Sequence, residues 1–555
     1  MARTRARTLK VAALSTVVAL ALAACSSSSQ DTANTEPRDS VVFAIAGGNL
    51  ENGHMDPHSS QLDVSAYVQR NVFDSLVAMS SDGELIPWLA TQWTVSEDGR
   101  TYTFTLRDDV TFHDGEHFDA AAAVRNFEHI QADETASAQA LAMIGGELFD
   151  RAEATGDYEL TLHLTEPFAP LLTNLTTAFT GFYSPAVLDA HSQDDIKAGG
   201  PEVSVGTGPY KLTEYTPAQQ IVYTANEDYA WGPALTDNAG EPLAANPGIT
   251  TLTVRILPEE SARIGALQSG QADISVDLTA NALTQLGDLN SQNAPSPGMP
   301  YSAILNWSHG HLSDQKVRQA VQVAVNLDEA VPAALGDSFQ RSWSVLSPST
   351  VNAFDESTVG SWPYDPEQAN TLLDEAGWSE RDADGYRVKD GERLRLEWLS
   401  WLPFSDEKRA LVTFLVDDLK KVGVELVHEA VEGPDYQARY FSEEEGMILD
   451  FDITDWGFAS LDGDVMRQHL HSAGYQNATT VADSDLDALL EEAATTTDPT
   501  QRLALYGQVQ QWNVENVAMI PLYSPQFITA WSDSISGIAF DRYGWPLLHG
   551  ISATN

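Results

Sequence analysis

Residues 394–427 read LRLEWLSWLPFSDEKRALVTFLVDDLKKVGVELV. The runs 394–398 and 424–427 are short, rich in apolar residues and typical of strands, whereas 407–421 repeats its apolar residues at helical spacing. A strand, a helix and a strand in succession form a βαβ unit, with two parallel strands and a right-handed crossover. The stretch therefore predicts a mixed α/β fold.

The alternation of strands and helices continues on both sides of this unit. Asp365 is expected to cap a helix that starts at Pro366, with Gln368 at its third position and Gly377 just beyond its end. Further strands are expected at 101–106 and 158–164, and further helices at 317–325, 485–493 and 499–514.

Length and charge limit the classes of protein to which this chain can belong. Its 555 residues allow about three or four domains of ordinary size. With 80 Asp and Glu against 30 Lys and Arg, the net charge is −50, which argues against nucleic acid as a partner because phosphate binding needs clustered basic residues. The 13 Trp, 17 Tyr and 19 Phe argue against a disordered acidic chain.

The N-terminus has the pattern of a secretory signal. Four basic residues between 3 and 10 precede the apolar run 11–24, which is too short to span a bilayer. Cys25, the only cysteine, follows Leu-Ala-Ala and resembles the cysteine of a bacterial lipobox. That resemblance implies cleavage before Cys25 and acylation of the cysteine, which would anchor the chain stably; the alternative is an ordinary signal peptide with an incidental cysteine.

The residues after Cys25 predict a tether. Segment 26–40 is rich in Ser, Thr, Asp and Pro and has no apolar periodicity, so we expect a flexible connection between a lipid anchor and a folded body.

Motifs for catalysis are not evident in the sequence. It has no phosphate-binding loop ending in Gly-Lys-Ser/Thr, no His-Glu-x-x-His and no Gly-x-Ser-x-Gly. A site assembled from distant segments stays possible, so an extracytoplasmic hydrolase is kept as a remote alternative. Three pairs of histidines resemble metal ligands, and for each a structural or exposed role is favoured over metal ligation: His54 with His58, His309 with His311, and His469 with His471. Gly53, Pro57 and Gly310 indicate loops around the first two pairs.

A series of segments along nearly the whole chain resembles the family 5 extracytoplasmic solute-binding proteins of ABC importers. The segments, in order, are 82–90 (DGELIPWLA), 96–99 (SEDG), 102–107 (YTFTLR), 112–115 (FHDG), 205–210 (VGTGPY), 266–270 (ALQSG), 317–320 (VRQA), 372–377 (LLDEAG) and 520–523 (IPLY). The resemblance implies an α/β, two-lobed periplasmic-binding-protein-like fold of class II, cluster C. Its lobes would close on a ligand, and the first would carry an extra small α+β domain.

The same resemblance suggests boundaries for these parts. We expect a lipoprotein signal peptide at 1–24, a tether at 25–40, lobe I at 41–72, 205–306 and 537–555, the extra small domain at 73–204, and lobe II at 307–536.

The ligand-site residues follow from the family pattern. Trp456 occupies the position at which the family presents a tryptophan to the cleft, where a flat ring offers apolar contact at little entropic cost; core packing is the competing role. Three residues later the oligopeptide branch has an aspartate for the ligand's amino terminus. Here that residue is Ala459, so Asp462 and Asp464 are the nearest candidates.

The other edge of the cleft is expected after Asp56-Pro57. In that loop Ser60 and Asp63 are the candidates for ligand contact.

The overall similarity is closest to the nickel-binding branch. However, the arginines that this branch directs at a metal chelate fall near Ala178 and Gly181, so a charge-assisted contact is lost. His469 and His471 lie where that branch places a ligand-contacting histidine. Nickel import is therefore the alternative to peptide import.

The function that the resemblance implies is capture of a small peptide or peptide-like solute. The chain would deliver it to an ABC permease driven by separate ATPase subunits, without a cofactor, as a monomer held outside the cell membrane by lipidated Cys25.

Overall fold

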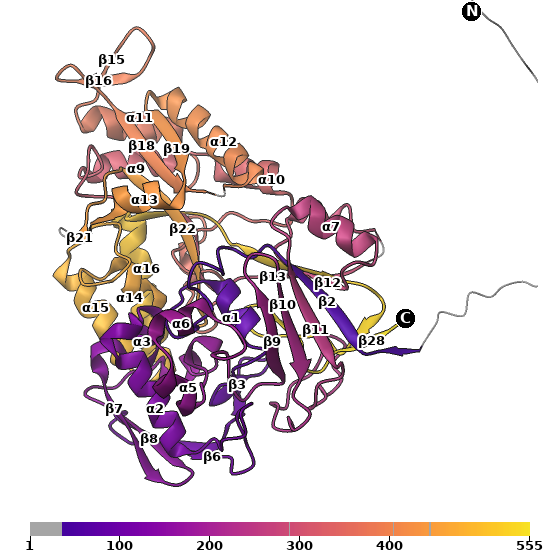
Figure 1. Cartoon of the computed structure of the whole chain (residues 1–555). Coiled ribbons are helices and arrows are strands. Elements are labelled where there is room, and N and C mark those ends of the chain that lie inside the picture. The colour runs from indigo at the N-terminus through magenta and orange to yellow at the C-terminus, as the bar shows by residue number, and fades with distance from the viewer. Residues whose placement is uncertain (1–35, 288, 403, 443–445) are drawn as a thin grey trace, which may run out of the picture.

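The computed structural model describes residues 36–287, 289–402, 404–442 and 446–555. They form two lobes, each built on its own sheet (Figure 1). Lobe I comprises 36–295 and 526–555, and lobe II comprises 298–523. The expected signal peptide 1–24, Cys25 and most of the expected tether lie outside the described residues.

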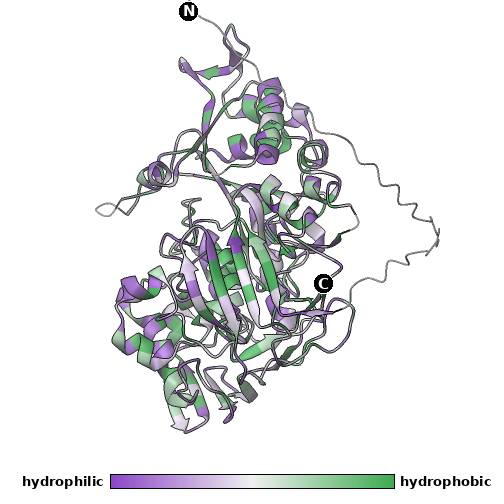
Figure 2. Ribbon diagram, turned by 45° about the vertical axis from the view of Figure 1, so that its right-hand side comes forward, coloured by the Kyte–Doolittle hydropathy of each residue, from purple (hydrophilic) through white to green (hydrophobic). Residues whose placement is uncertain are grey.

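Lobe I is centred on a seven-stranded sheet with the order β13-β24-β12-β2-β11-β10-β9. β2 is almost entirely buried and pairs in parallel with both β11 and β12, because its run of Val, Phe, Ala and Ile lies at the centre of the sheet. Hydrophobic residues dominate these central strands in Figure 2. The strands are β2 (Ser40–Ile45), β9 (Tyr210–Thr216), β10 (Gln220–Ala225), β11 (Thr251–Ile256), β12 (Ile274–Ser275), β13 (Asn290–Pro295) and β24 (Gln526–Trp531).

The region expected to form the small domain contains an antiparallel sheet of four strands, in the order β5-β6-β8-β7, with α2 (Ala120–Gln131) packed on β7. Its buried apolar residues form one continuous core with those of the seven-stranded sheet, so this region is fixed to lobe I. The strands are β5 (Ala90–Val95), β6 (Thr101–Leu106), β7 (Phe149–Gly156) and β8 (Glu159–Leu164).

Lobe II is built on a five-stranded sheet with the order β19-β18-β22-β14-β23. The expected βαβ unit is confirmed, because β18 and β19 pair in parallel on either side of α12 (Asp406–Val422). Ser405 caps this helix, and Gly423, at φ 88°, ends it. The strands are β14 (Gly298–Leu305), β18 (Arg395–Trp401), β19 (Glu425–Val431), β22 (Ile453–Ala459) and β23 (Met519–Tyr523).

Helices cover both faces of this sheet. Adjacent residues of β18 point to opposite sides, so Trp398 enters one hydrophobic core and Leu399 the other. One core is completed by α9 (Gln315–Val323), α10 (Leu327–Leu335), α11 (Pro366–Glu375) and α12, and the other by α13 (Gly433–Tyr440), α14 (Val465–Leu470), α15 (Ser484–Thr495) and α16 (Pro499–Asn516).

The expected helix ends are confirmed where capping residues mark them. The Asp365 side chain accepts a hydrogen bond from the Gln368 backbone N–H at 2.8 Å, and Gly377 adopts φ 88° after the helix. Asp498 likewise accepts from Gln501 N–H at 2.9 Å at the start of α16.

Within the residues that the structure describes, the chain crosses between the lobes twice. It passes from β13 to β14 through Ser296 and Pro297, and it returns from β23 to β24 through Ser524 and Pro525. The boundaries expected after residues 306 and 536 lie later in the chain than these crossings, because β14 already belongs to the sheet of lobe II and β24 to that of lobe I.

Within the described residues, no helix has both the length and the apolar character needed to cross a membrane.

Candidate functional site

A cleft of about 570 Å³ lies between the lobes, beside the two crossings. Both lobes contribute to its walls, and Ser296 and Pro525 close its hinge end. Lobe I contributes Gly48, Asn49, Asp63, Leu278, Thr279 and Ala280, and lobe II contributes aromatic residues and charges, chiefly Tyr301, Phe339, Trp401, Phe404, Glu407, Lys408, Asp455, Trp456 and Tyr523.

One wall is made by the end of β18 and the start of α12. Trp401 is the last residue of the strand, and Lys408 lies in the first turn of the helix, which Ser405 caps. In open α/β sheets, ligands bind in the crevice outside the carboxyl ends of the strands, so the cleft has the position that the topology favours.

Lys408 supplies a positive charge to this wall. Its Nζ lies 4.1 Å from the ring centre of Tyr301 and 5.9 Å from that of Phe404. The side chain is half-buried, and this burial lowers the pKa of Lys408, while Asp455 opposes the effect. A half-buried cation over aromatic rings is a strong binding partner for an anionic group.

Asp455 lies at the base of the cleft and is held by three donors. Its carboxylate accepts hydrogen bonds from the Tyr301 hydroxyl, the Trp398 indole N–H and the Ser400 hydroxyl. These bonds fix the orientation of the carboxylate and of the Tyr301 ring that faces Lys408.

Trp456 both lines the cleft and packs against the core of lobe II. It sits in β22 opposite Ser302 of β14, with its ring centre 6.1 Å from that of Tyr440 and 6.3 Å from that of His469. Tyr440 and His469 therefore pack against the Trp456 ring. Among the described residues, its indole N–H has no hydrogen-bond partner.

Asp63 faces the cleft from lobe I. It is the first residue of α1 (Asp63–Gln69). Partial removal of the carboxyl group from water, together with the carboxylates of Asp277 and Asp541, raises the pKa of Asp63 to about 7, although the residue as a whole is exposed.

Ser60 is buried in the turn before α1. Its hydroxyl lies 3.3 Å from His54 Nδ1 and accepts a hydrogen bond from the Leu62 backbone N–H at 3.2 Å. These contacts brace the turn that leads to Asp63.

Asp462 and Asp464 are each paired with an arginine. Arg502 donates to both carboxylate oxygens of Asp462 at 2.8 and 2.6 Å, and Arg467 to both of Asp464 at 2.9 and 2.7 Å. Asp462 lines a separate hollow between the lobes, with Arg502. Bidentate pairing satisfies these carboxylates within lobe II.

The two candidate histidines lie behind the cleft or away from it. His469 is fully buried, with Nδ1 2.9 Å from the Val465 carbonyl oxygen, and burial lowers the pKa of His469 to about 4. His471 Nε2 lies 3.2 Å from a carboxylate oxygen of Glu491 in α15. Across the part of the chain that the structure describes, no three His, Cys, Asp or Glu side chains are grouped to hold a metal ion.

The lobes also touch away from the hinge. The Gln476 side-chain amide of lobe II donates to Gln61 Oε1 of lobe I at 2.9 Å, and Ala169 N–H donates to the Ala494 carbonyl at 2.9 Å. Figure 1 shows α14, α15 and α16 beside the four-stranded region of lobe I. The lobes are therefore in contact both at the crossings and through these residues.

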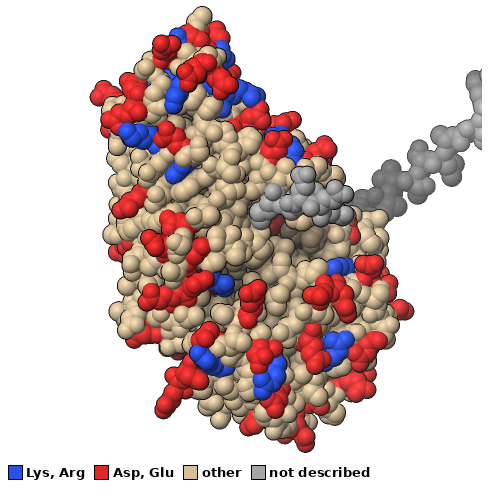
Figure 3. Space-filling view, turned by 90° about the vertical axis from the view of Figure 1, so that its left-hand side faces the viewer, with Lys and Arg blue, Asp and Glu red and all other residues tan. Residues whose placement is uncertain are grey.

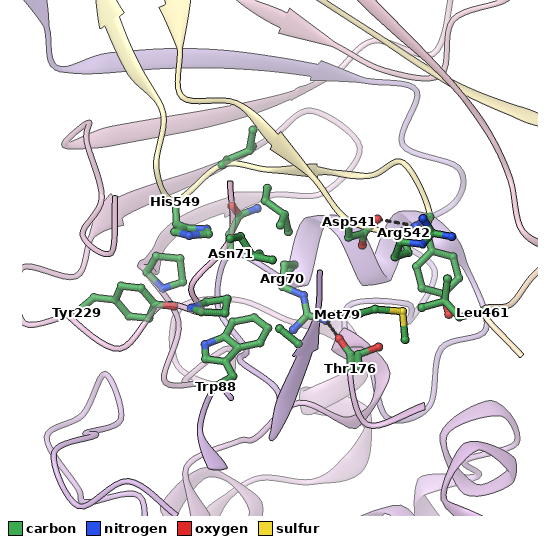
Figure 4. Close-up of a pocket in the computed structure, with 17 residues that line it drawn as sticks. Arg70, Asn71, Met79, Trp88, Thr176, Tyr229, Leu461, Asp541, Arg542 and His549 are labelled. Carbon is green, nitrogen blue, oxygen red and sulfur yellow. Dashed lines mark hydrogen bonds between the residues drawn. The ribbon is translucent and has the colours of Figure 1, made fainter. Parts of the chain in front are cut away.

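A smaller cavity lies mainly within lobe I (Figure 4). Arg70 at its centre donates to the Thr176 carbonyl at 2.7 Å and lies 4.9 Å from the ring centre of Trp88. The cavity has a volume of about 40 Å³, which leaves room for a few water molecules and is too small for a peptide.

Sequence patterns alone did not single out Lys408, Asp455 or the aromatic residues around them. Lys408 resembles any other charged residue of an amphipathic helix. The available signal was its place in the first turn of a helix that follows a buried strand, since such turns lie at the ligand-binding edge of α/β sheets.

The model of the bacterial extracellular solute-binding proteins, family 5 (middle region), matches residues 84–478. The nickel-binding periplasmic protein of Escherichia coli K12 is 30% identical over 82% of this chain and 84% of its own length. The dipeptide-binding protein of the same strain is 28% identical, with coverages of 77% and 78%. The structure of a Bacillus subtilis oligopeptide-binding protein with a nonapeptide superimposes with a TM-score of 0.78 at 20% identity, covering 94% of this chain and 100% of that one. The expected two-lobed α/β fold is confirmed.

Proposed function

Because this chain belongs to the bacterial extracellular solute-binding proteins of family 5, we propose that it captures a small peptide or peptide-like solute in the cleft and delivers it to an ABC permease. The family acts outside the cytoplasm and binds solutes. The identity of the solute and of the transport partners is the part that we propose.

The distribution of charge across the cleft supports a peptide. Lys408 lies on lobe II and Asp63 on lobe I, so a ligand with a carboxylate and an ammonium group can contact both lobes at once. Trp456, Tyr301 and Tyr523 supply flat apolar surface between them, which suits side chains and peptide bonds of varied sequence.

Asp63 replaces Asp462 and Asp464 as the proposed partner of the ligand's ammonium group. The two aspartates of lobe II are already paired with Arg502 and Arg467, and breaking a buried pair costs more than a new pair returns. Ser60 then acts as a positioning residue, since it braces the turn before Asp63.

Closure of the lobes follows from these contacts. A ligand that binds both walls favours the closed arrangement by its difference in affinity for the two states. No covalent step is needed, so the solute leaves unaltered. This outcome separates a receptor from the alternative of a hydrolase.

The location and partners complete the proposal. We propose that the chain is secreted, cleaved before Cys25 and held at the cell membrane through that lipidated cysteine, as a monomer that requires no cofactor. The permease and its ATPase subunits would be separate proteins.

The test of the peptide proposal is calorimetric titration with a panel of di- to pentapeptides and their C-terminal amides. Wild type should prefer the free acids, and Lys408→Gln should lose most of that preference; Lys316→Gln, an exposed lysine paired with Glu375, serves as the matched control. Equal affinity of wild type for acids and amides would refute the role of Lys408.

Nickel is the second candidate, favoured by the identity to the nickel-binding periplasmic protein. Its test is titration of nickel with free histidine into wild type and into variants with His469 and His471 changed to Ala. Absence of heat in the wild type would end the nickel hypothesis, and heat that His469→Ala abolishes would replace the peptide proposal.

A further inference from the structure

Another hollow, of about 400 Å³, lies in lobe II, next to the ligand cleft. Phe339 lines both cavities and so forms part of the wall between them. Arg341 and Ser342, shortly after Phe339, run beside β23. The Ser342 N–H donates to the Leu522 carbonyl at 3.1 Å, and the backbone of Arg341 forms an antiparallel bridge with that of Tyr523. Because Tyr523 also lines the cleft, the hollow adjoins the ligand site.

Arg341 and Asp328 are the charged residues that line this hollow, and the hydrogen-bonding capacity of Arg341 is poorly used. Its side chain is 6% exposed, yet Nη1 makes two contacts of 3.4 Å, to Asp328 and to the Trp362 carbonyl, and these are long for hydrogen bonds. Among the described residues, Nε has no partner. A guanidinium offers five N–H donors in a planar fork, so this one has donors left for another acceptor.

Besides Arg341, the hollow is lined by the polar residues Asp328, Gln340 and Ser342 and by aromatic and aliphatic side chains. The Arg341 guanidinium lies 3.5 Å from the ring centre of Trp343, and Phe354 and Val359 line the remaining wall. The contact of Arg341 with Asp328 is long, so the unused N–H donors of Arg341, beside these aromatic and aliphatic side chains, suit an anion attached to an apolar group: the apolar part gains from burial while the charge pairs with Arg341.

The charge of the whole chain sharpens this argument. Its net charge is −50, and acidic side chains are scattered over the face in Figure 3, with fewer basic ones. Such a surface repels anions in general, so a buried arginine with spare donors marks a local exception.

We propose that the Arg341 hollow is a second subsite, which binds a carboxylate carried on an aromatic or apolar group. This proposal rests on the proposed function: a ligand long enough to extend from the cleft beyond Phe339 places such a group in the hollow. The hollow thereby selects for length and for an anionic, apolar end.

The probe for this subsite is 4-fluorobenzoate, followed by fluorine NMR line broadening and shift upon titration of the protein. Wild type should bind it, and Arg341→Gln should weaken binding at least tenfold. Arg395→Gln, an exposed arginine of lobe II paired with Glu397, is the matched control and should bind as wild type does.

A second variant guards against a folding defect in Arg341→Gln. Val359 is 57% exposed, so Val359→Glu should fold normally while placing a carboxylate at the rim, and it should weaken probe binding several-fold. Failure of wild type to bind 4-fluorobenzoate, or equal binding by Arg341→Gln and Val359→Glu, would overturn the proposal.

The result is separable from the peptide proposal. Loss of probe binding in Lys408→Gln together with its retention in Arg341→Gln would place the probe in the cleft and refute the second subsite. Failure of every peptide to bind, with probe binding still dependent on Arg341, would refute the peptide proposal and leave the anion subsite standing.

Discussion

Ser296 donates its backbone N–H to the backbone carbonyl of Pro525 over 2.8 Å, so the two segments that connect the lobes are bonded side by side. Both residues also line the cleft. Motion of one lobe relative to the other is therefore expected to pivot at the closed end of the ligand site, where a small rotation opens the far side widely.

Trp456→Ala tests the apolar wall of the cleft. We expect peptide affinity to fall at least tenfold, because a ring that lines the cleft is removed, while the midpoint of thermal unfolding stays within a few degrees. Calorimetry and thermal denaturation measure the two effects. Trp93→Ala, a half-buried tryptophan of β5, should keep wild-type affinity; equal affinity of Trp456→Ala and wild type would remove this residue from the site.

Gln476→Ala tests the contact that joins the lobes opposite the hinge. Loss of the 2.9 Å hydrogen bond to Gln61 should weaken ligand affinity about two- to tenfold, since a hydrogen bond contributes roughly 0.5–1.5 kcal/mol and this one exists only when the lobes meet. The matched control is Gln508→Ala on the exposed side of α16. An unchanged dissociation constant for Gln476→Ala would show that this contact does not stabilise closure.

The pH dependence of peptide binding tests Asp63. Desolvation and the carboxylates of Asp277 and Asp541 raise the pKa of Asp63 to about 7. Asp63 therefore becomes more fully ionised as pH rises from 6 to 7.5 and attracts an ammonium group more strongly. Wild-type affinity for a free peptide should rise over this range, and Asp63→Asn should show a flat profile. An N-acetylated peptide is the control; a rise that survives in Asp63→Asn would contradict the assignment.

The stability of the fold should fall on acidification. The pKa of His469 is about 4 in the folded protein because of its burial, against about 6.5 in an unfolded chain. Between pH 6.5 and pH 4, His469 is therefore protonated in the unfolded state but neutral in the folded state. Its contribution to the free energy of unfolding is full above pH 6.5 and is lost toward pH 4.

Thermal melts at pH 7 and pH 5 measure this effect. The melting temperature should fall less from pH 7 to pH 5 in His469→Gln than in wild type, by a few degrees. His117 is exposed, so His117→Gln should behave like wild type. Equal losses in all three proteins would show that His469 does not contribute.

The fold could be predicted from the sequence where local signals were strong. The strands and helix of 394–427 have clear periodicities, and Asp365 and Gly377 mark both ends of α11. The crossings between lobes escaped prediction because strands of both sheets carry the same buried, apolar pattern: nothing in the composition of β14 says which sheet it joins.

The candidate site was predictable only in part. The family pattern led to Trp456 and Asp63, which both line the cleft. It also led to Asp462, whose partner Arg502 comes from α16, 40 residues later in the chain. Pairings at such a distance, like the meeting of Lys408 with Tyr301, depend on tertiary packing that spacing does not reveal.

Native mass spectrometry of the purified protein tests the central claim most directly. We predict a species heavier than the bare chain by the mass of one small solute, which acid releases chemically unaltered and which rebinds to the emptied protein but not to Trp456→Ala. A protein that carries and rebinds no solute from peptide mixtures, or that returns a cleaved molecule, would contradict the account.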